Sequence, residues 1–284
     1  LKFGFKIGIE ILLCIIMSPK LLKHVKYIFV FFTKIVTICK KMWYYKFMLN
    51  LYITSSNRRE GKTFLTAGLA ATMQSLGYST TVYKPIQTNG IERNGFMQSP
   101  DLTYVKTIDP YINTHFSYLY KSDLEPLIAS ELENEPIDVE LISREYGRIS
   151  STSDCTLLDG DCGILSPIAP AVQTADLVKK LQLPLLFVVT PREDSINDTL
   201  LSIYTAQEKG LEIRGVVINN IKDDCPKNLL NAIPRVIEEY TNIKILGLIS
   251  HIEGKISPED LITSILNGVD IESIFNVKIE KLEL

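Results

Sequence analysis

Short runs of apolar and β-branched residues alternate with longer segments of helical periodicity from residue 50 to residue 249. The short runs predict strands at residues 51–54, 79–83, 155–158, 185–189, 214–218 and 244–249. The periodic segments predict helices at residues 63–76, 137–147, 196–209 and 228–240. Mostly apolar strands that are separated by helices are buried on both faces. The pattern therefore predicts an α/β fold, a single doubly wound, mostly parallel sheet with helices on both faces.

Residues 87–135 interrupt this alternation with a long segment that is poor in regular pattern. Long connections of this kind often carry function. Within the segment, Ser99-Pro100-Asp101 has the capping serine, the first-turn proline and the early acid of an ordinary helix start. On their own, these three residues favour that interpretation of Asp101. Ser257-Pro258-Glu259 predicts a further helix start of the same kind.

Residues 1–47 differ in composition from the rest of the chain. They contain nine lysines, no arginine and one acid, and Phe, Ile, Lys and Tyr supply 26 of them. Lysines interrupt the apolar stretches, which disfavours a membrane-spanning helix and a signal peptide and leaves a basic surface-lying helix as an alternative. We interpret the segment as translated upstream sequence, with the natural start at Met48 and one domain over 48–284.

Charge, cysteine and histidine content narrow the function classes. The whole chain carries a net charge of −3, and because residues 1–47 carry +8, the remainder carries −11. This balance offers no electrostatic footprint for nucleic acid. Five cysteines without a C-x-x-C pair favour reduced thiols in a cytoplasmic protein. The histidines, His24, His115 and His251, are scattered, so the sequence provides neither a histidine metal cluster nor a Ser-His-Asp arrangement.

The segment 54–63, Thr-Ser-Ser-Asn-Arg-Arg-Glu-Gly-Lys-Thr, lies between a predicted strand and a predicted helix. Free amides at a helix start bind anions, so this context makes Gly-Lys-Thr a candidate phosphate cradle. In such a cradle Lys62 reaches the terminal phosphates and the Thr63 hydroxyl holds Mg²⁺. Glu60 adds a negative charge beside the phosphates, and Arg58 and Arg59 either offset that charge or are simply solvated.

Polar residues follow several of the predicted strands. Lys84 and Thr88 follow the second strand, Asp159 the third and Asn219 the fifth. Ligands of open parallel sheets gather beyond the carboxyl ends of the strands, so one shared cleft explains these positions. Asp159 is placed like a carboxylate that holds Mg²⁺, with an ordinary Asp-Gly turn as the alternative.

Together these residues resemble the dethiobiotin synthetase family of ATP-dependent cyclising ligases. The resemblance covers nearly all of residues 49–250. Its motifs are the loop that ends in Gly61-Lys62-Thr63, the strand segment 83–88 (Tyr-Lys-Pro-Ile-Gln-Thr), Ser99-Pro100-Asp101, 158–163 (Leu-Asp-Gly-Asp-Cys-Gly), Leu183-Pro184, 195–198 (Ser-Ile-Asn-Asp) and 215–219 (Gly-Val-Val-Ile-Asn). Lysine-proline followed by Gln-Thr is the most specific of them.

The resemblance implies a P-loop NTPase-like fold and a defined reaction. Diaminopelargonate reacts with CO₂ or bicarbonate to give a carbamate, the carbamate takes the γ-phosphoryl group of ATP, and the second amine closes a ureido ring as phosphate leaves. It also implies Mg²⁺ as cofactor and a cytoplasmic homodimer without nucleic-acid or membrane partners. Because this chemistry requires positive charge and placement rather than a histidine base, it agrees with the residues available.

Site residues follow from the same resemblance. Lys62 and Lys84 would be the catalytic lysines, and Lys84 and Thr88 would contact the substrate. Mg²⁺ would be held by Thr63, Asp101 and Asp159. ATP would be bound by Asn57, Arg58, Arg59, Glu60, Gly61, Lys62, Thr63 and Asn219.

Some positions depart from the family pattern. Ser55 replaces the first loop glycine, Asp159 stands where Glu is usual, and Asp161-Cys162 replaces small residues beside the substrate. Other departures are Glu125-Pro126-Leu127, in place of a Ser-Pro-His-like segment, and Ser250, in place of a proline near the adenine. We expect these departures to bear on substrate choice and activity.

Two alternative functions share parts of the pattern. One is the amino-terminal regulatory domain of phosphotransacetylases, which the lack of an acetyltransferase domain within the 284 residues disfavours. The other is a partition-type ATPase. Those proteins carry lysine at the start of the phosphate loop, where this chain has Ser55 and Ser56, and −11 over the domain discourages DNA binding.

Overall fold

The computed structural model describes residues 49–276 and residue 278, so the predicted extension 1–47 and the proposed start at Met48 lie outside the described residues. Seven strands form one sheet in the order β11-β10-β9-β1-β6-β2-β5, and all neighbouring pairs are parallel. The strands are β1 (Leu49–Ser55), β2 (Thr80–Gln87), β5 (Asn113–Leu119), β6 (Cys155–Asp159), β9 (Leu185–Val189), β10 (Ile213–Ile221) and β11 (Ile245–Ser250). The predicted α/β fold class is confirmed.

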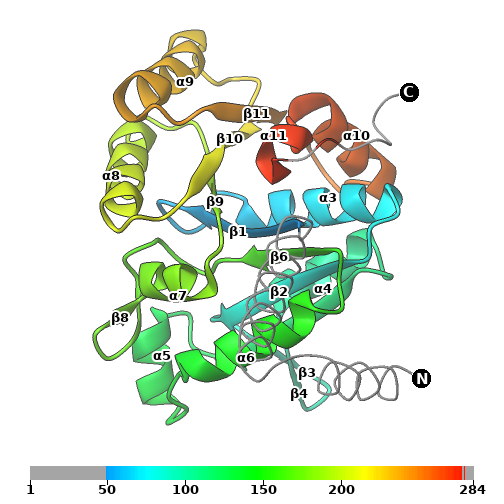
Figure 1. Ribbon diagram of the computed structural model, residues 1–284. Coiled ribbons are helices and arrows are strands. Elements are labelled where there is room, and N and C mark those ends of the chain that lie inside the picture. Colours follow the sequence, from blue (N-terminus) through cyan, green and yellow to red (C-terminus); the bar gives the residue numbers. More distant parts are fainter. Residues whose placement is uncertain (1–48, 277, 279–284) are drawn as a thin grey trace, which may run out of the picture. The chain divides into compact units, whose positions relative to one another are not determined.

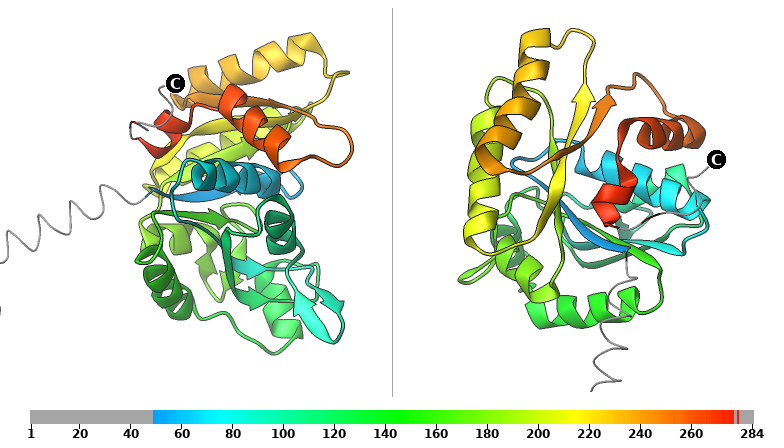
Figure 2. Two further views of the ribbon diagram at one scale, coloured as in Figure 1. Left: turned by 90° about the vertical axis from the view of Figure 1, so that its right-hand side faces the viewer. Right: turned by 45° about the horizontal axis from the view of Figure 1, so that its top comes forward.

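Helices cover both faces of this sheet (Figure 1, Figure 2). One face packs against α3 (Lys62–Ser75), α4 (Pro100–Ile108), α10 (Pro258–Gly268) and α11 (Ile271–Phe275). The other packs against α5 (Pro126–Leu132), α6 (Val139–Ser150), α7 (Thr174–Leu181), α8 (Ser195–Glu208) and α9 (Lys227–Thr241). Successive side chains of a strand point to opposite faces, and in β1 Leu51 and Ile53 belong to the first core while Tyr52 belongs to the second.

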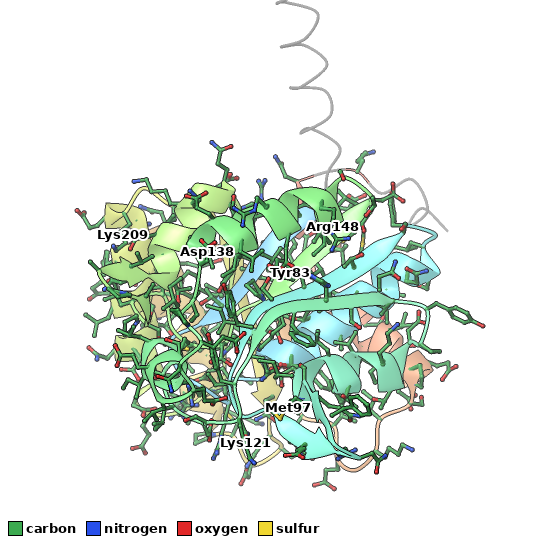
Figure 3. All side chains as sticks on the ribbon, turned by 90° about the horizontal axis from the view of Figure 1, so that it is seen from below. Tyr83, Met97, Lys121, Asp138, Arg148 and Lys209 are labelled. Atoms are coloured by element: carbon green, nitrogen blue, oxygen red, sulfur yellow. The ribbon has the colours of Figure 1, made fainter. Side chains whose placement is uncertain are left out.

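The α6 side of the sheet illustrates this packing. Viewed from below, Asp138 and Arg148 mark the region of α6, and Tyr83 of β2 lies beside it (Figure 3). Tyr83 is fully buried and its hydroxyl donates to the Ile142 carbonyl at 3.5 Å. Asp138 caps the helix by accepting from the Glu140 amide, so α6 begins two residues later than the periodicity predicts.

The segment 87–135 contains more regular structure than its sequence pattern indicates. It holds the hairpin β3 (Ile91–Arg93) and β4 (Phe96–Gln98), then α4, the edge strand β5 and α5. The helix start predicted at Ser99-Pro100-Asp101 is confirmed, because the Ser99 hydroxyl accepts from the Leu102 amide. A second small hairpin, β7 (Pro167–Ala169) and β8 (Val172–Gln173), precedes α7.

No helix among the described residues is both long enough and apolar enough to span a membrane. Cys155, Cys162 and Cys225 are free thiols, as their spacing predicts, and Cys14 and Cys39 lie outside the described residues.

Candidate functional site

A cavity of about 450 Å³ opens at the carboxyl ends of β1, β2 and β6. It is lined by Arg58, Arg59, Gly61, Lys62, Thr63, Lys84, Gln87, Thr88, Asn89, Asp101, Asp123 and Asp161. Eight of the residues that the sequence singles out therefore face one space: Arg58, Arg59, Gly61, Lys62, Thr63, Lys84, Thr88 and Asp101. Asn57, Glu60, Asp159 and Asn219 do not line it and lie behind or beside its wall.

The phosphate loop connects β1 to α3. Gly61 has a left-handed φ of +83° and directly precedes α3, whose first turn has no side-chain cap. The free amides of this turn are therefore available to an anion. Lys62 turns back along the loop, and its ammonium donates to the Ser55 hydroxyl at 2.9 Å and to the Asn57 carbonyl at 3.3 Å. Ser55, which replaces a glycine of the family pattern, thus provides a neutral partner for this lysine.

Lys62 is buried without a carboxylate in hydrogen-bond contact. Burial lowers its pKa, and the nearby charge of Lys84 lowers the pKa further. An ammonium in this state gains strongly from an anionic ligand, because the ligand supplies the negative charge that its present partners lack.

Asn219 supports the loop from β10. Its side-chain amide donates to the backbone carbonyls of Glu60 and Gly61 at 3.3 and 3.4 Å. A Cβ on Gly61 would lie 2.1 Å from this amide nitrogen. Glycine is therefore required at position 61 both for its positive φ and for the close approach of Asn219.

Replacing Gly61 with alanine is expected to lower the free energy of unfolding by about 2 kcal/mol, from left-handed strain and the clash with Asn219. Chemical denaturation measures this change. Gly95→Ala is the matched control, because Gly95 has a similar φ of +77° and a Cβ added there would meet nothing within 4 Å. The excess destabilisation of Gly61→Ala reports the clash alone, and equal effects at both glycines would contradict a specific role for Asn219.

Lys84 lies within β2 between two carboxylates. Its ammonium is 2.6 Å from Asp101 and 3.1 Å from Asp159, and it also donates to the Gly160 carbonyl at 3.4 Å. Burial by itself would lower the pKa of Lys84, but Asp159 and Asp101 together raise it above the ordinary lysine value. The lysine is therefore held as a buried cation.

Lys84 lowers the pKa of both carboxylates, but the net shifts are opposite because the two differ in burial. Burial opposes ionisation of Asp101, but Lys84 and hydrogen bonds from Gln87 and Thr63 bring the pKa of Asp101 below its usual value. Asp159 is more deeply buried, and burial raises its pKa despite Lys84. Asp101 is thus the first-turn acid of α4, as its sequence predicts, and also the ion-pair partner of Lys84.

Oxygen atoms from Thr63, Asp101 and Asp159 lie close together, because Thr63 bonds to Asp159 and both carboxylates contact the Lys84 ammonium. The Thr63 hydroxyl donates to Asp159 at 2.9 Å, and Thr66 donates to the other carboxylate oxygen at 3.4 Å. Hard oxygen donors of this kind suit Mg²⁺. Across residues 49–276, no group of three or more His, Cys, Asp or Glu side chains is placed to hold a metal ion. A magnesium ion here would therefore rely on these few protein oxygens together with phosphate and water.

Glu60 points away from the cavity. Its carboxylate accepts from the Thr190 amide at 2.7 Å and pairs with Arg192 at 2.6 Å. Of the two alternatives for Arg58 and Arg59, the one in which they offset this charge is wrong. Arg59 is exposed, as the other alternative expects, and Arg58 pairs with Asp123. Arg192 neutralises the Glu60 carboxylate, and the pair ties the phosphate loop to the segment after β9. Arg192 is 132 residues away in sequence, so sequence spacing gave no signal for it.

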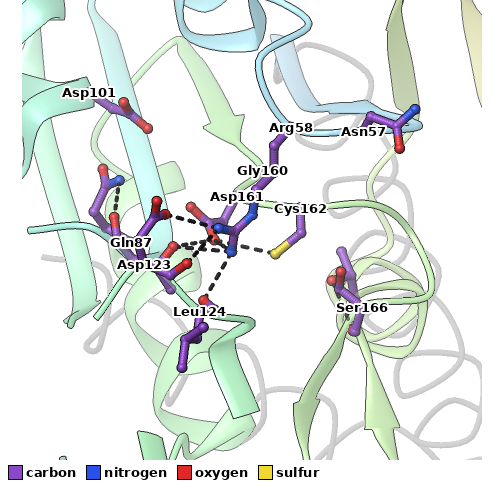
Figure 4. Close-up of polar contacts among 12 residues, drawn as sticks. Asn57, Arg58, Gln87, Asp101, Asp123, Leu124, Gly160, Asp161, Cys162 and Ser166 are labelled. Atoms are coloured by element: carbon purple, nitrogen blue, oxygen red, sulfur yellow. Dashed lines mark hydrogen bonds and ion pairs between the residues drawn. The ribbon is translucent and has the colours of Figure 1, made fainter. Parts of the chain in front are cut away.

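Arg58 extends from the phosphate loop to the segment before α5 (Figure 4). It donates to the Asp123 carboxylate at 2.9 Å and to the Leu124 carbonyl at 3.0 Å. Arg58 also lines a neighbouring cavity of about 430 Å³ together with Asn57, Glu125 and Cys162. The thiol of Cys162 is buried beside Asp161, and burial raises its pKa, so it is held in the unreactive protonated form.

Comparisons with known proteins agree with the nucleotide-binding geometry. A sequence model described as "AAA domain" matches residues 49–259. The chain is 30% identical to an ATP-dependent dethiobiotin synthetase of Anoxybacillus flavithermus, over 72% of this chain and 92% of that protein. It is 28% identical to the enzyme of the same name from Bacillus subtilis, over 81% of this chain and 98% of that protein. Among solved structures, a ParA family ATPase from Chlorobium tepidum shares the fold, with a TM-score of 0.50 and 14% identity over 81% of this chain and 97% of that one.

Proposed function

The chain belongs to the family described as "AAA domain", and from its similarity to dethiobiotin synthetases over most of its length we propose that it is a Mg-ATP-dependent carbon–nitrogen cyclo-ligase that converts 7,8-diaminopelargonate and CO₂ to dethiobiotin. The observation that carries the proposal is the single cavity that both Lys62 and Lys84 face. One lysine belongs to the phosphate loop and the other to β2, so phosphate and acceptor can meet between them. The relatives named dethiobiotin synthetase support the choice of reaction.

The proposed role of the phosphate loop is to bind ATP. The amides that begin α3 and the Lys62 ammonium bind the phosphates, with Asn57, Arg58, Arg59, Gly61 and Thr63 around them. Glu60 contributes through its ion pair with Arg192, which fixes the loop. Asn219 supports the loop with its amide group, and its proposed second role is to bind the adenine of ATP.

Lys84 and Thr88 act on the acceptor. In the proposed reaction the carbamate oxygen attacks the γ-phosphorus, ADP leaves, and attack by the second amine on the carbamate carbon then releases phosphate. Lys84 stabilises the negative charge that the carbamate and the transferring phosphoryl group share, because it is already fixed as a cation. Thr63, Asp101 and Asp159 fit a magnesium ion, which would neutralise phosphate charge when bound.

Incubating the full-length chain with diaminopelargonate, bicarbonate and Mg-ATP tests this function. We expect mass spectrometry to detect the cyclic urea, formed one for one with ADP. Omitting the diamine is the control, because a ligase then releases little ADP. ATP hydrolysis at the same rate with and without the diamine would contradict the proposal and favour the partition-type ATPase or a nucleotide-binding regulatory domain.

The resemblance also leads us to propose a cytoplasmic homodimer that uses neither nucleic acid nor a membrane as a partner. Light scattering of the full-length chain checks the oligomeric state.

A further inference from the structure

Asp161 is a carboxylate on the wall of the same cavity, two residues beyond the end of β6. Its side chain is 12% exposed. The Thr88 hydroxyl donates to its Oδ2 atom at 2.9 Å, and the Cys162 thiol donates to the same atom at 3.3 Å. These contacts fix the carboxylate from one side.

The nearest cation to Asp161 does not pair with it closely. The nearest guanidinium nitrogen, Nη2 of Arg58, is 3.7 Å from Oδ2. The same guanidinium is engaged by shorter contacts to Asp123 and Leu124, at 2.9 and 3.0 Å (Figure 4). Lys84, by contrast, contacts Asp101 and Asp159 directly. Asp161 is therefore the least closely paired of the three largely buried aspartates around the site.

An incompletely paired carboxylate is costly in a cavity that has to receive phosphate. Negative charges repel each other strongly where water is largely excluded, so Asp161 would weaken phosphate binding unless a cation joined it. Each hydrogen bond described above uses Oδ2. Among the described residues Oδ1 accepts no hydrogen bond, so this oxygen is left for a ligand donor.

We propose that Asp161 binds an ammonium group of the acceptor and thereby selects a diamine over a monoamine of the same length. The inference rests on the proposed function, whose acceptor carries two amino groups on adjacent carbons, one of which is protonated at neutral pH. One amine becomes the carbamate beside Lys84. The other is held by Asp161 through an ionic hydrogen bond; it loses one proton to solvent before its lone pair attacks the carbamate carbon and a second as phosphate leaves. Thr88 is a positioning residue that orients the carboxylate.

Asp161→Asn tests the inference, because asparagine keeps the size of the side chain and an oxygen for Thr88 but removes the charge. Calorimetry without ATP measures the Kd of diaminopelargonate and of the two analogues that each lack one amine. We expect the variant to bind the diamine roughly 10- to 100-fold more weakly, the loss of one charged hydrogen bond, and to lose the preference for the diamine over one of the analogues. The variant should bind ATP at least as tightly as the native chain.

Glu92→Gln is the matched control. Glu92 also makes a 3.7 Å ion pair, with Lys121, but lies 56% exposed on the β3–β4 hairpin. The Glu92→Gln variant should keep the Kd values of the diamine, of both analogues and of ATP within twofold of the native values. Its melting temperature shows the effect of losing a surface carboxylate.

The ways in which the inference can fail are distinguishable. If the native chain makes the cyclic urea and Asp161→Asn binds the diamine as tightly as the native chain, the role of Asp161 is overturned and the proposed function stands. If the native chain neither binds nor converts the diamine, both fall. Equal weakening of the diamine and both analogues would also overturn the inference, since it indicates a general distortion of the cavity.

Discussion

Lys84→Gln is expected to reduce the rate of cyclic urea formation roughly 10³-fold. Losses of this size are typical when an enzyme loses a fixed group that stabilises charge in the transition state. Glutamine has nearly the same length but no charge. The phosphoryl group and the carbamate would then approach each other with only the phosphate-loop lysine between them. Single-turnover measurement of ADP formation with saturating diamine and bicarbonate measures this step directly.

The same substitution has a cost for stability. Asp101 and Asp159 lose the cation between them, and removal of one partner from a buried ion pair typically costs about 3–5 kcal/mol. The assay is therefore run well below the melting temperature of the variant. Lys106→Gln is the control, because the exposed Lys106 ammonium donates to the Pro110 carbonyl and, within the described residues, pairs with no carboxylate. A Lys84→Gln enzyme that is folded and turns over within tenfold of the native rate would contradict the assignment.

Lys62→Met is expected to stabilise the ligand-free chain while weakening ATP binding roughly 100-fold. The lowered pKa of Lys62 shows that folding is opposed by burial of its charge near Lys84. A lysine whose pKa is lowered on folding destabilises the folded chain at every pH below its unfolded-state pKa, and neutral pH lies in that range. Methionine fills the space without the charge, and the lost charged hydrogen bonds to phosphate account for the weaker ATP binding.

Thermal unfolding and ATP calorimetry test the two effects together. A rise in melting temperature of about 2–4 °C corresponds to about 1 kcal/mol in a domain of this size. Lys106→Met controls for the gain of an apolar side chain. A fall in melting temperature would show that the bonds from Lys62 to Ser55 and Asn57 outweigh the cost of burying its charge, contrary to this account.

The central strands of the sheet were predictable because they are buried on both faces. Leu185–Val189 is apolar at every position, so its sequence identifies it without tertiary information. The edge strand Asn113–Leu119 is different, because most of its residues are exposed or half-buried. Several of them are polar, so the segment lacks the continuous apolar run that identifies a buried strand. Its pairing with β2 comes from backbone hydrogen bonds, which leave little trace in sequence.

The candidate site, like the sheet, was predictable in part. Lys62, Thr63 and Lys84 lie in local motifs that sequence identifies, and the parallel sheet brings them to one cavity. The contacts of Glu60 with Arg192 and of Arg58 with Asp123 join distant loops. Such pairs depend on how the loops fold over the sheet, so the residues that form them cannot be recognised from the sequence pattern.

The oxygen balance of the reaction gives the most direct test of the central claim, that phosphate and a carbamate meet between Lys62 and Lys84. The full-length chain is supplied with ¹⁸O-labelled bicarbonate, diaminopelargonate and Mg-ATP in unlabelled water, and the released phosphate is analysed by mass spectrometry before the label exchanges. We expect each phosphate to carry one oxygen from bicarbonate, because the carbamate oxygen that attacks phosphorus leaves with it when the ring closes. Phosphate that carries only unlabelled oxygen would show that water attacks ATP instead, and would contradict the account.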